Sequence, residues 1–311
     1  MIVGFVGLGT MGRRMATNIQ RGGFSLIVHD LNPAAGDDLV QGGATWADSL
    51  ADLAERADVV FTSLPGPVEV EAVALGSGGL LETMRPGTAY FDLSTNSPTV
   101  IRRLHALFAE RGIQLFDAPV SGGPRGAETT KLAIWVGGDE AVFAAHAAVF
   151  ASFSDQARYV GPIGAGSVAK LVHNCAGYVI QTALAEVFTL GVKAGVDPLG
   201  LFEAVRAGAI GRRRTFDGLI DQFLPGEFDP AAFALRLAHK DVSLATALGR
   251  EHGVPMRLAN LTLEEMTEAL GRGWADRDSR VTMLLQEERS DVAIAVPRDD
   301  IRAVIQADRK K

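Results

Sequence analysis

The sequence predicts two domains, an N-terminal α/β domain built on a doubly wound parallel sheet and an all-α C-terminal domain. Three observations support this division. A glycine-rich turn joins an apolar strand to a helix within residues 1–18, helices and apolar strands then alternate, and helical periodicity without a convincing strand follows. The chain has 311 residues and a hydrophobic share of 47%, enough for two cores. We therefore expect domains at 1–161 and 162–292 and, at 293–311, a charged tail that forms one loose helix.

The N-terminal turn contains three glycines, Gly7, Gly9 and Gly12, with the spacing G-x-G-x-x-G. Between a strand and a helix, the first glycine permits a tight turn, the second lets a pyrophosphate approach the backbone, and the third allows helix and strand to pack closely. The helix N-terminus adds free N–H groups and a positive dipole. We expect a Rossmann domain that binds a dinucleotide, with Thr10 and Met11 of the motif among the cofactor-binding residues. The alternative is a plain turn between two core elements.

Asp30 is the last residue of the second predicted strand, residues 25–30, and lies 23 residues after Gly7. A carboxylate about 20 residues after the first glycine binds the 2′-hydroxyl of the adenosine ribose. It would repel the 2′-phosphate of NADP, and the next residues, Leu31 to Pro33, offer that phosphate neither Arg nor Ser or Thr. We therefore expect NAD rather than NADP. Alternatively, Asp30 caps the next helix, although Asn32 can do so without it.

The composition argues against several classes of partner and compartment. The net charge of −7 and the pI of about 5.4 do not suit a nucleic-acid-binding surface, which needs clustered Lys and Arg. One cysteine, Cys175, cannot form an internal disulfide, and we interpret it as a buried packing residue in a reducing compartment. We recognise no signal peptide and expect a cytoplasmic protein. The apolar stretch 175–192 contains Gln181 and Glu186 and suits a buried helix better than a membrane span.

Two loops of the first predicted domain follow strands, at the edge where open α/β sheets bind ligands. One is Leu64–Pro67, and the other is the hydroxyl-rich loop Ser94–Pro98. Each has a simpler interpretation, as a proline turn and as a helix cap respectively. We expect helices at 33–41, 47–56, 68–75, 79–84, 99–111 and 140–150, and strands at 58–63, 88–93, 112–117, 132–136 and 157–160.

A second motif opens the long helix that we expect to run to about residue 194. Gly164 and Gly166 precede Lys170 and Asn174, which are four residues apart and therefore share one helix face. The glycines would leave room for a ligand at the backbone. A lysine in a dry pocket can bind a carboxylate or pass a proton to a carbonyl oxygen. The alternative is a lysine on a solvated helix face. A helix of roughly 28 residues spans ~42 Å and would form the spine of the second domain.

Six motifs occur in an order that is typical of one enzyme family. They are Gly7–Gly12 with Met15, Ala16 and Asn18; Leu64-Pro65-x-Pro67; Asp92–Thr95; Asp117–Gly123; the pattern from Gly164 to Asn174; and Lys240-Asp241. With these motifs the chain resembles the β-hydroxyacid dehydrogenase family, whose members include 3-hydroxyisobutyrate dehydrogenase and tartronate semialdehyde reductase. The resemblance extends to about Leu285 and implies a Rossmann domain followed by a helical domain, assembled into a homodimer or homotetramer.

The resemblance also implies roles for individual residues. Lys170 matches the family's catalytic lysine, which is the acid/base at the substrate oxygen, and Asn174 matches an amide that holds substrate. The resemblance further implies hydride transfer between the substrate carbon and NAD, and a substrate that is a small 3-hydroxy carboxylate or its semialdehyde. The loop Ser121, Gly122 and Gly123 matches the one that grips the substrate carboxylate. The matching cofactor contacts are Asp30, Leu64, Pro65, Thr95 and Lys240, the last closing over the nicotinamide end.

The chain departs from the family pattern at three places. Thr130 stands where members often have glycine, and Arg125 stands where a small residue is commoner. The segment 208–215, with Arg212 to Arg214, replaces a small, hydroxyl-rich stretch that faces substrate in relatives. These arginines can pair with a second anionic group of the substrate, or they can belong to a solvated helix end. The sequence therefore leaves the identity of the substrate open.

Two other functions fit the same fold. An imine reductase shares it, but such enzymes usually replace the lysine that Lys170 provides. A non-catalytic dinucleotide-binding protein would tend to lose the lysine and to carry extra domains for partners. We expect a dehydrogenase with no metal site.

Overall fold

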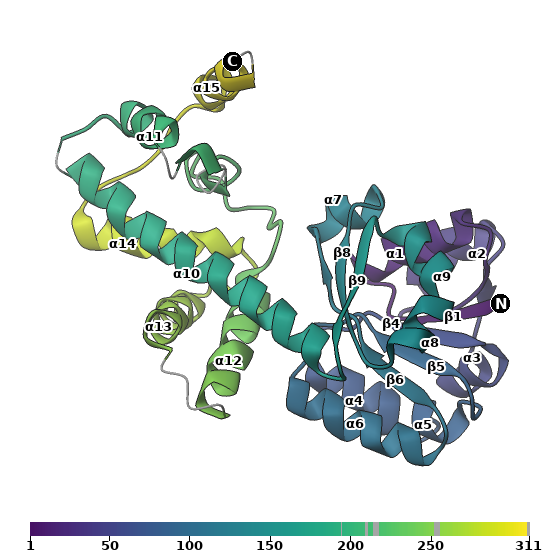
Figure 1. Cartoon of the computed structure of the whole chain (residues 1–311). Helices are drawn as coiled ribbons and strands as arrows, with labels where there is room; N and C mark the ends of the chain where they lie inside the picture. Colours follow the sequence, from purple (N-terminus) through teal and green to yellow (C-terminus); the bar gives the residue numbers. More distant parts are fainter. Residues whose placement is uncertain (194, 209–210, 214–217, 252–255, 310–311) are drawn as a thin grey trace. The chain divides into compact units, whose positions relative to one another are not determined.

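The computed structural model describes residues 1–193, 195–208, 211–213, 218–251 and 256–309. The chain divides into two compact units, Met1–His173 and Asn174–Lys311 (Figure 1). The first unit is α/β and the second is helical, so the predicted fold class is confirmed.

The first unit is built on a nine-stranded sheet of order β3-β2-β1-β4-β5-β6-β8-β7, in which β9 pairs with β8. The strands from β3 to β6 are parallel, as predicted. Strand β8 is antiparallel to β6 and β7, so the sheet is mixed at this edge. Residues 122–132, which join β7 to β8, are fewer than the dozen or more that a parallel crossover needs. The strands are β1 (Ile2–Val6), β2 (Ser25–His29), β3 (Thr45–Trp46), β4 (Val59–Thr62), β5 (Ala89–Asp92), β6 (Gln114–Asp117), β7 (Val120–Ser121), β8 (Ala133–Gly137) and β9 (Gln156–Gly161).

Helices cover both faces of this sheet because successive side chains along its strands point to opposite sides. On β1, Val3 and Phe5 belong to one hydrophobic core and Val6 to another. Figure 1 shows α1 and α9 beside one face and α4, α5 and α6 beside the other. The helices are α1 (Gly12–Arg21), the 3₁₀ helix η1 (Pro33–Gly36), α2 (Asp37–Gln41), α3 (Leu50–Arg56), α4 (Pro67–Leu75), α5 (Leu80–Thr83), α6 (Pro98–Glu110), α7 (Gly123–Glu128), α8 (Glu140–Ala145) and α9 (Ala147–Phe153).

The predicted elements of the first unit differ from the structure where elements are short. Strands β3 and β7 have two residues each and helix α7 has six, too few for a periodic pattern to reveal them. The single helix expected at 140–150 is two helices that meet at His146. Of these elements, β7 and α7 matter for function because they carry the expected carboxylate loop.

The second unit is helical, as predicted. Helix α10 (Ala165–Lys193) has 29 residues and carries the chain from the first unit into the second. Within the described part of this unit, the β-type pairing is one isolated bridge between Ala234 and Asp278. The further helices are α11 (Pro198–Ala207), η2 (Gly211–Arg213), α12 (Leu235–Glu251), α13 (Arg257–Gly271), η4 (Ser279–Met283), α14 (Leu284–Ser290) and α15 (Arg298–Arg309).

The C-terminal segment packs on the second unit, which differs from the expectation of a separate loose tail. Ile294, Val296 and Ile301 are buried in the core of this unit. Val296 N–H donates to the Leu224 carbonyl at 2.7 Å. Charged residues concealed Ile301 in the sequence, because only one side of α15 is apolar.

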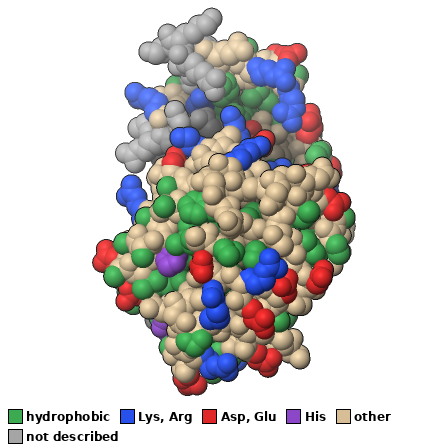
Figure 2. Space-filling view, turned by 90° about the vertical axis from the view of Figure 1, so that its right-hand side faces the viewer, with side chains coloured by type: hydrophobic (Ala, Val, Ile, Leu, Met, Phe, Trp, Pro, Cys, Tyr) green, Lys and Arg blue, Asp and Glu red, His purple; other side chains and the backbone are tan. Residues whose placement is uncertain are grey.

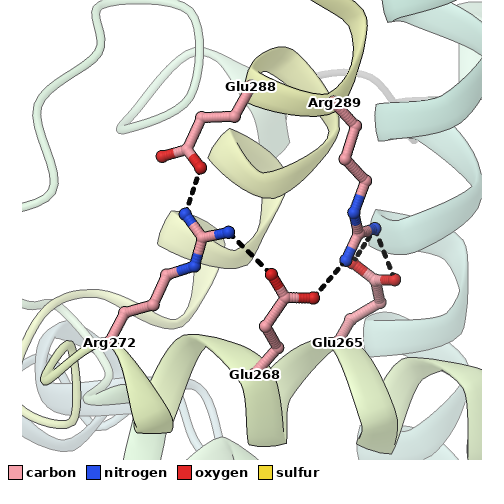
Figure 3. A network of polar contacts seen from close by, with 5 residues as sticks. All are labelled: Glu265, Glu268, Arg272, Glu288 and Arg289. Atoms are coloured by element: carbon pink, nitrogen blue, oxygen red, sulfur yellow. Dashed lines mark hydrogen bonds and ion pairs between the residues drawn. The ribbon is translucent and has the colours of Figure 1, made fainter.

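Acidic and basic side chains are mixed on the surface of the chain. Figure 3 shows a network that ties α13 to α14, in which Arg272 pairs with Glu268 and Glu288, and Arg289 pairs with Glu265 and Glu268. In Figure 2, basic and acidic side chains are interspersed over the face shown. Among the described residues, no helix is both long and apolar enough to cross a membrane.

Candidate active site

The glycine-rich turn has the geometry that a pyrophosphate site requires. Gly7 has a φ of +91°, and a Cβ there would collide with the Ser63 carbonyl oxygen. A Cβ on Gly12 would collide with the Gly7 carbonyl, so these two glycines make the turn and the close packing possible. Gly9 is exposed, and nothing lies within 4 Å of the position of its missing Cβ. The open glycine lies just before the N-terminus of α1, beside exposed Thr10 and half-buried Met11, and this arrangement fits a bound dinucleotide.

Asp30 lies at the end of β2, next to this turn. Its two carboxylate oxygens accept the backbone N–H groups of Leu8 at 2.6 Å and Asn32 at 2.8 Å. The Asn32 side chain caps η1 by accepting from Ala34 N at 3.3 Å, so this helix start does not need Asp30 as its cap. Asp30 is half-buried, which leaves part of the carboxylate accessible to a ribose.

The loops after β4 and β5 are joined to each other by a buried polar network. Leu64 N–H donates to Ser94 Oγ at 2.9 Å. Asp92 accepts hydrogen bonds from Thr62 Oγ1, Ser94 N and Asn96 Nδ2 at 2.9 to 3.0 Å. Burial raises the pKa of the Asp92 carboxyl, and these three donors counteract that rise. The buried hydrogen bonds of Asp92 and Ser94 therefore hold both loops in place.

Two predicted cofactor contacts lie on these loops and remain accessible. Pro65 is exposed and Thr95 is half-buried, whereas Asn96 beside Thr95 is buried. The sequence identified the loops but not the role of Asp92, because that role depends on partners from two strands. The sequence feature that could have indicated this role is a lone acidic residue at the end of a continuous apolar strand.

The predicted carboxylate loop joins β7 to α7. Ser121 is half-buried at the end of β7, and Gly122 and Gly123 have φ values of +135° and +61°. Asn18 Nδ2 donates to the Ala127 carbonyl at 2.6 Å and so ties α7 to α1. The Ser121 hydroxyl lies 3.1 Å from Nε2 of His173, a contact that sequence reasoning did not anticipate.

The glycines at the start of α10 serve packing, which corrects the expectation that they leave room for a ligand. A Cβ on Gly166 would lie 2.7 Å from the Asp117 carbonyl oxygen, and one on Gly164 would lie 2.8 Å from Arg102 Nε. The buried Asp117 carboxylate accepts the N–H groups of Gly164 at 2.8 Å and Ser167 at 2.5 Å. Gly166 is needed because the helix start approaches β6 and β8 closely, and Gly164 is favoured because its φ is +90°.

Lys170 lies one turn further along α10 and is buried, with 9% of its surface exposed. This burial excludes the interpretation of Lys170 as a lysine on a solvated helix face. His173 follows three residues later and therefore lies on the same side of the helix. The pKa of the His173 imidazole is lowered, first by burial and then by the charge of Lys170.

In the second unit, Asp241 connects two further predicted residues. Asn174 Nδ2 donates to Asp241 Oδ2 at 2.6 Å, and Lys240 Nζ lies 2.9 Å from Asp241 Oδ1. Asp241 is almost completely buried, with 1% exposed. Burial, followed by the Asp241 charge, raises the pKa of the neighbouring Tyr178 well above its usual value. Asp241 belongs to the Lys240-Asp241 motif, but its contacts with both Asn174 and Lys240 were not predicted.

The arginines proposed for a second anion are exposed where the structure describes them. Arg125 lies on α7, and Arg212 lies on η2 in the other unit, where its Nε is 3.5 Å from the Gly208 carbonyl. The Arg213 side chain and all of Arg214 lie outside the described residues. Thr130, where relatives often have glycine, has a φ of +59°, a left-handed backbone that favours glycine.

Sequence profiles cover most of the chain. The profile of the NAD binding domain of 6-phosphogluconate dehydrogenase matches residues 2–161. The profile described as NAD-binding of NADP-dependent 3-hydroxyisobutyrate dehydrogenase matches residues 164–285. The chain belongs to the β-hydroxyacid dehydrogenase family. As a β-hydroxyacid dehydrogenase, it is an NAD(P)-dependent enzyme that acts on small hydroxy acids.

Individual relatives of this β-hydroxyacid dehydrogenase match along nearly their whole length. The chain is 33% identical to 2-(hydroxymethyl)glutarate dehydrogenase of Eubacterium barkeri, covering 94% of this chain and 97% of that protein. It is 35% identical to NAD-dependent L-serine dehydrogenase of Pseudomonas aeruginosa, covering 91% and 97%. The structure of Mycobacterium tuberculosis 3-hydroxyisobutyrate dehydrogenase with L-serine superposes with a TM-score of 0.81 at 29% identity, covering 91% and 98%.

Proposed function

We propose that this β-hydroxyacid dehydrogenase interconverts a small 3-hydroxy carboxylate and its semialdehyde or keto form with NAD, and that Lys170 is the catalytic acid/base. The observation that carries the proposal is the burial of Lys170, 9% exposed, in the unit that also holds the glycine-rich turn and Ser121. The compounds named for the three relatives, hydroxymethylglutarate, serine and hydroxyisobutyrate, share a hydroxyl on the carbon β to a carboxylate. This shared unit supports the substrate class.

The residues proposed to act on substrate each have a chemical task. Neutral Lys170 accepts the proton of the substrate hydroxyl as the C–H bond breaks, and its ammonium returns that proton to the carbonyl oxygen in the reverse direction. General acid–base assistance of this kind contributes about 10²- to 10⁴-fold in rate. The Ser121 hydroxyl and the N–H groups of Gly122 and Gly123 hold the carboxylate, and the Asn174 amide is a further substrate ligand.

The open position at Gly9 and the accessible part of Asp30 support NAD as the cofactor. When bound, NAD accepts the hydride from the substrate carbon. The Asp30 carboxylate would bind the ribose 2′-hydroxyl and would repel a 2′-phosphate. The residues proposed to hold the cofactor are Gly7, Gly9, Thr10, Met11, Gly12, Asp30, Leu64, Pro65, Thr95 and Lys240.

The proposal is tested by following NADH formation with a panel of 3-hydroxy monocarboxylates and dicarboxylates and a hydroxysulfonate. Lys170→Ala should lower kcat by about 100-fold or more while the Kd for NADH stays within about twofold. Lys131→Ala is the matched control, because Lys131 is an exposed lysine of the same unit that pairs with Asp155. Full activity of Lys170→Ala would exclude the assigned role.

The preference for NAD has its own test. Replacing Asp30 by Ser together with Leu31→Arg removes the repelling carboxylate and adds a cation, so the ratio of kcat/KM for NADP to that for NAD should rise about tenfold or more. Asp37→Ser, an exposed acid on α2, is the control and should leave the ratio unchanged. An unchanged ratio in the double variant would show that Asp30 does not select the cofactor.

We also propose that the second anionic group of a dicarboxylate substrate can be bound by Arg125 or Arg212. The exposure of both arginines and the dicarboxylate in the name of the Eubacterium relative support this extension. Arg125→Ala and Arg212→Ala should then raise KM for dicarboxylates and leave KM for monocarboxylates unchanged. An unchanged KM for both classes would favour a solvated helix end.

Two alternative functions make different predictions for the same panel. Turnover of cyclic imines without turnover of hydroxy acids would favour an imine reductase, and tight NADH binding without any turnover would favour a dinucleotide-binding protein. Assembly into a homodimer or homotetramer is a further prediction, which light scattering after size-exclusion chromatography would test.

A further inference from the structure

His173 contacts the residue that we propose as the carboxylate ligand. Ser121 comes from β7 and His173 from α10, fifty-two residues apart in the chain, and Ser121 Oγ lies 3.1 Å from His173 Nε2. The imidazole packs against the indole of Trp135 on β8, with ring centroids 5.2 Å apart. Neighbours on two strands therefore define the position of this ring, although His173 itself is exposed.

The contact has a direction that follows from hydrogen-bond chemistry. A serine hydroxyl has a single proton, and it must donate that proton to bind a carboxylate. If His173 Nε2 accepted the proton, Ser121 would present lone pairs to an anion, which is repulsive. A neutral histidine carries one N–H and can carry it on Nε2, so that Ser121 Oγ accepts from the ring and keeps its own proton for the ligand.

The surroundings of His173 favour the neutral ring that this arrangement uses. Partial burial of the imidazole, followed by the charge of Lys170, lowers the pKa of His173 below its usual value. Lys170 and His173 are three residues apart on α10, so the proton-transferring lysine and the ring share one side of the helix. Trp135 covers part of the ring and so limits its rotation.

We propose that His173 is a positioning residue that donates from Nε2 to Ser121 Oγ and thereby turns the serine proton toward the substrate carboxylate. This inference rests on the proposed function, because it takes Ser121 as the carboxylate ligand. His173 itself need not touch the reacting atoms. Its loss should therefore weaken binding of the hydroxy acid and leave the chemical step nearly unchanged.

Three replacements of His173 separate the hydrogen bond from the packing. His173→Phe retains an aromatic ring against Trp135 but cannot donate. His173→Gln places an amide N–H near the position of Nε2, whereas His173→Asn places its amide closer to the position of Nδ1. We expect KM for the hydroxy acid to rise about three- to tenfold in the Phe and Asn variants, the size of one neutral hydrogen bond, and to stay within about twofold in the Gln variant.

The partnership with Ser121 is tested by a double-mutant cycle. Ser121→Ala should raise KM by itself, and adding His173→Phe to it should cause no further rise, because the partner is already gone. The value of kcat and the Kd for NADH should change less than about twofold in His173→Phe. Equal rises of KM from His173→Phe with and without Ser121, or a loss of kcat at constant KM, would overturn the proposal.

Failure of the proposed function can be distinguished from failure of this inference. Calorimetric titration of the NADH complex with 3-hydroxypropionate measures carboxylate binding without turnover, because both partners are reduced. If the wild type turns over no hydroxy acid, the proposed function fails, while this titration still decides the role of His173. Equal affinity of wild type and His173→Phe for 3-hydroxypropionate would refute that role.

Discussion

Two buried aspartates bind helix α10 in different ways. Asp117, in the first unit, accepts the backbone N–H groups of Gly164 and Ser167 at the start of the helix. Asp241, in the second unit, binds side chains, the amide of Asn174 and the ammonium of Lys240. Each aspartate has 1% of its surface exposed. Their burial is equal, and their partners differ.

The difference shows how a buried carboxylate can be assigned to stability or to function. A carboxylate that satisfies backbone donors determines where an element begins, so its loss is felt mainly as unfolding. A carboxylate that holds two polar side chains determines where those groups point, so its loss is felt mainly at the ligand that they bind. The contrast leads to opposite expectations for the two aspartates.

The largest effect should come from Asp117→Ala. The substitution leaves the buried N–H groups of Gly164 and Ser167 without an acceptor, and each such group costs about 1–3 kcal/mol. The unfolding free energy of the first unit should therefore fall by about 3 kcal/mol. For a unit of this size that loss corresponds to a Tm about 10 °C lower, measurable by calorimetry. Asp117→Asn, which keeps one acceptor, should lose less. An unchanged Tm in Asp117→Ala would show that the helix start is held by packing alone.

Asp241→Ala should have a smaller effect on stability and a clear effect on activity. Hydrogen bonds to charged groups are worth about 1.5–3 kcal/mol, so displacement of Asn174 and Lys240 should lower kcat/KM about 10- to 100-fold. Lys240 is partly exposed and can turn to water, which limits the loss of stability. Asp276→Ala, an exposed acid of the same unit that pairs with Arg236, is the control. Activity close to the wild type would make Asp241 a structural residue like Asp117.

The sequence predicted the backbone geometry of the glycine-rich turn better than the contacts around Ser121, for a physical reason. The tasks of Gly7 and Gly12 depend on local backbone geometry, which the spacing of residues encodes directly. The contact between Ser121 and His173 depends on where a strand and a helix meet after folding. Gly166 illustrates the limit, because its place in the motif indicates a close approach but not whether a ligand or a strand approaches.

The resemblance to the family suggested residues that spacing alone could not, and it also pointed to the unusual backbone at Thr130. It placed Lys170 and Asn174, which spacing alone could not distinguish from an ordinary helix face. Thr130 occupies a position where relatives often have glycine, and the left-handed backbone at this residue explains that preference. Asp117 and Asp241 belong to the family motifs, but only the structure shows which groups they bind.

Glu287 on α14 is another buried carboxyl, and it has features of both aspartates. Its Oε2 accepts Ile294 N–H at 2.8 Å and so holds the C-terminal segment, while Oε1 has no hydrogen-bond partner among the described residues. Burial raises the pKa of Glu287 from 4.5 to about 7, with the Glu288 charge adding to the rise and the Ile294 bond opposing it. The folded unit therefore prefers the protonated carboxyl.

This preference predicts the smallest of the effects. The folded-state pKa lies above the unfolded one, so the stabilisation is fully present below about pH 4.5 and is lost as the pH rises to about 7. Glu287→Gln cannot ionise, and it should be about 1–3 kcal/mol more stable than the wild type at pH 8, at most what the full pKa shift gives, and equally stable at pH 4. Urea unfolding at both pH values measures the difference. A variant that is less stable at pH 8 would show that the ionised Glu287 holds Ile294 better than the amide does, and would place Glu287 with Asp117 as a carboxylate that anchors backbone.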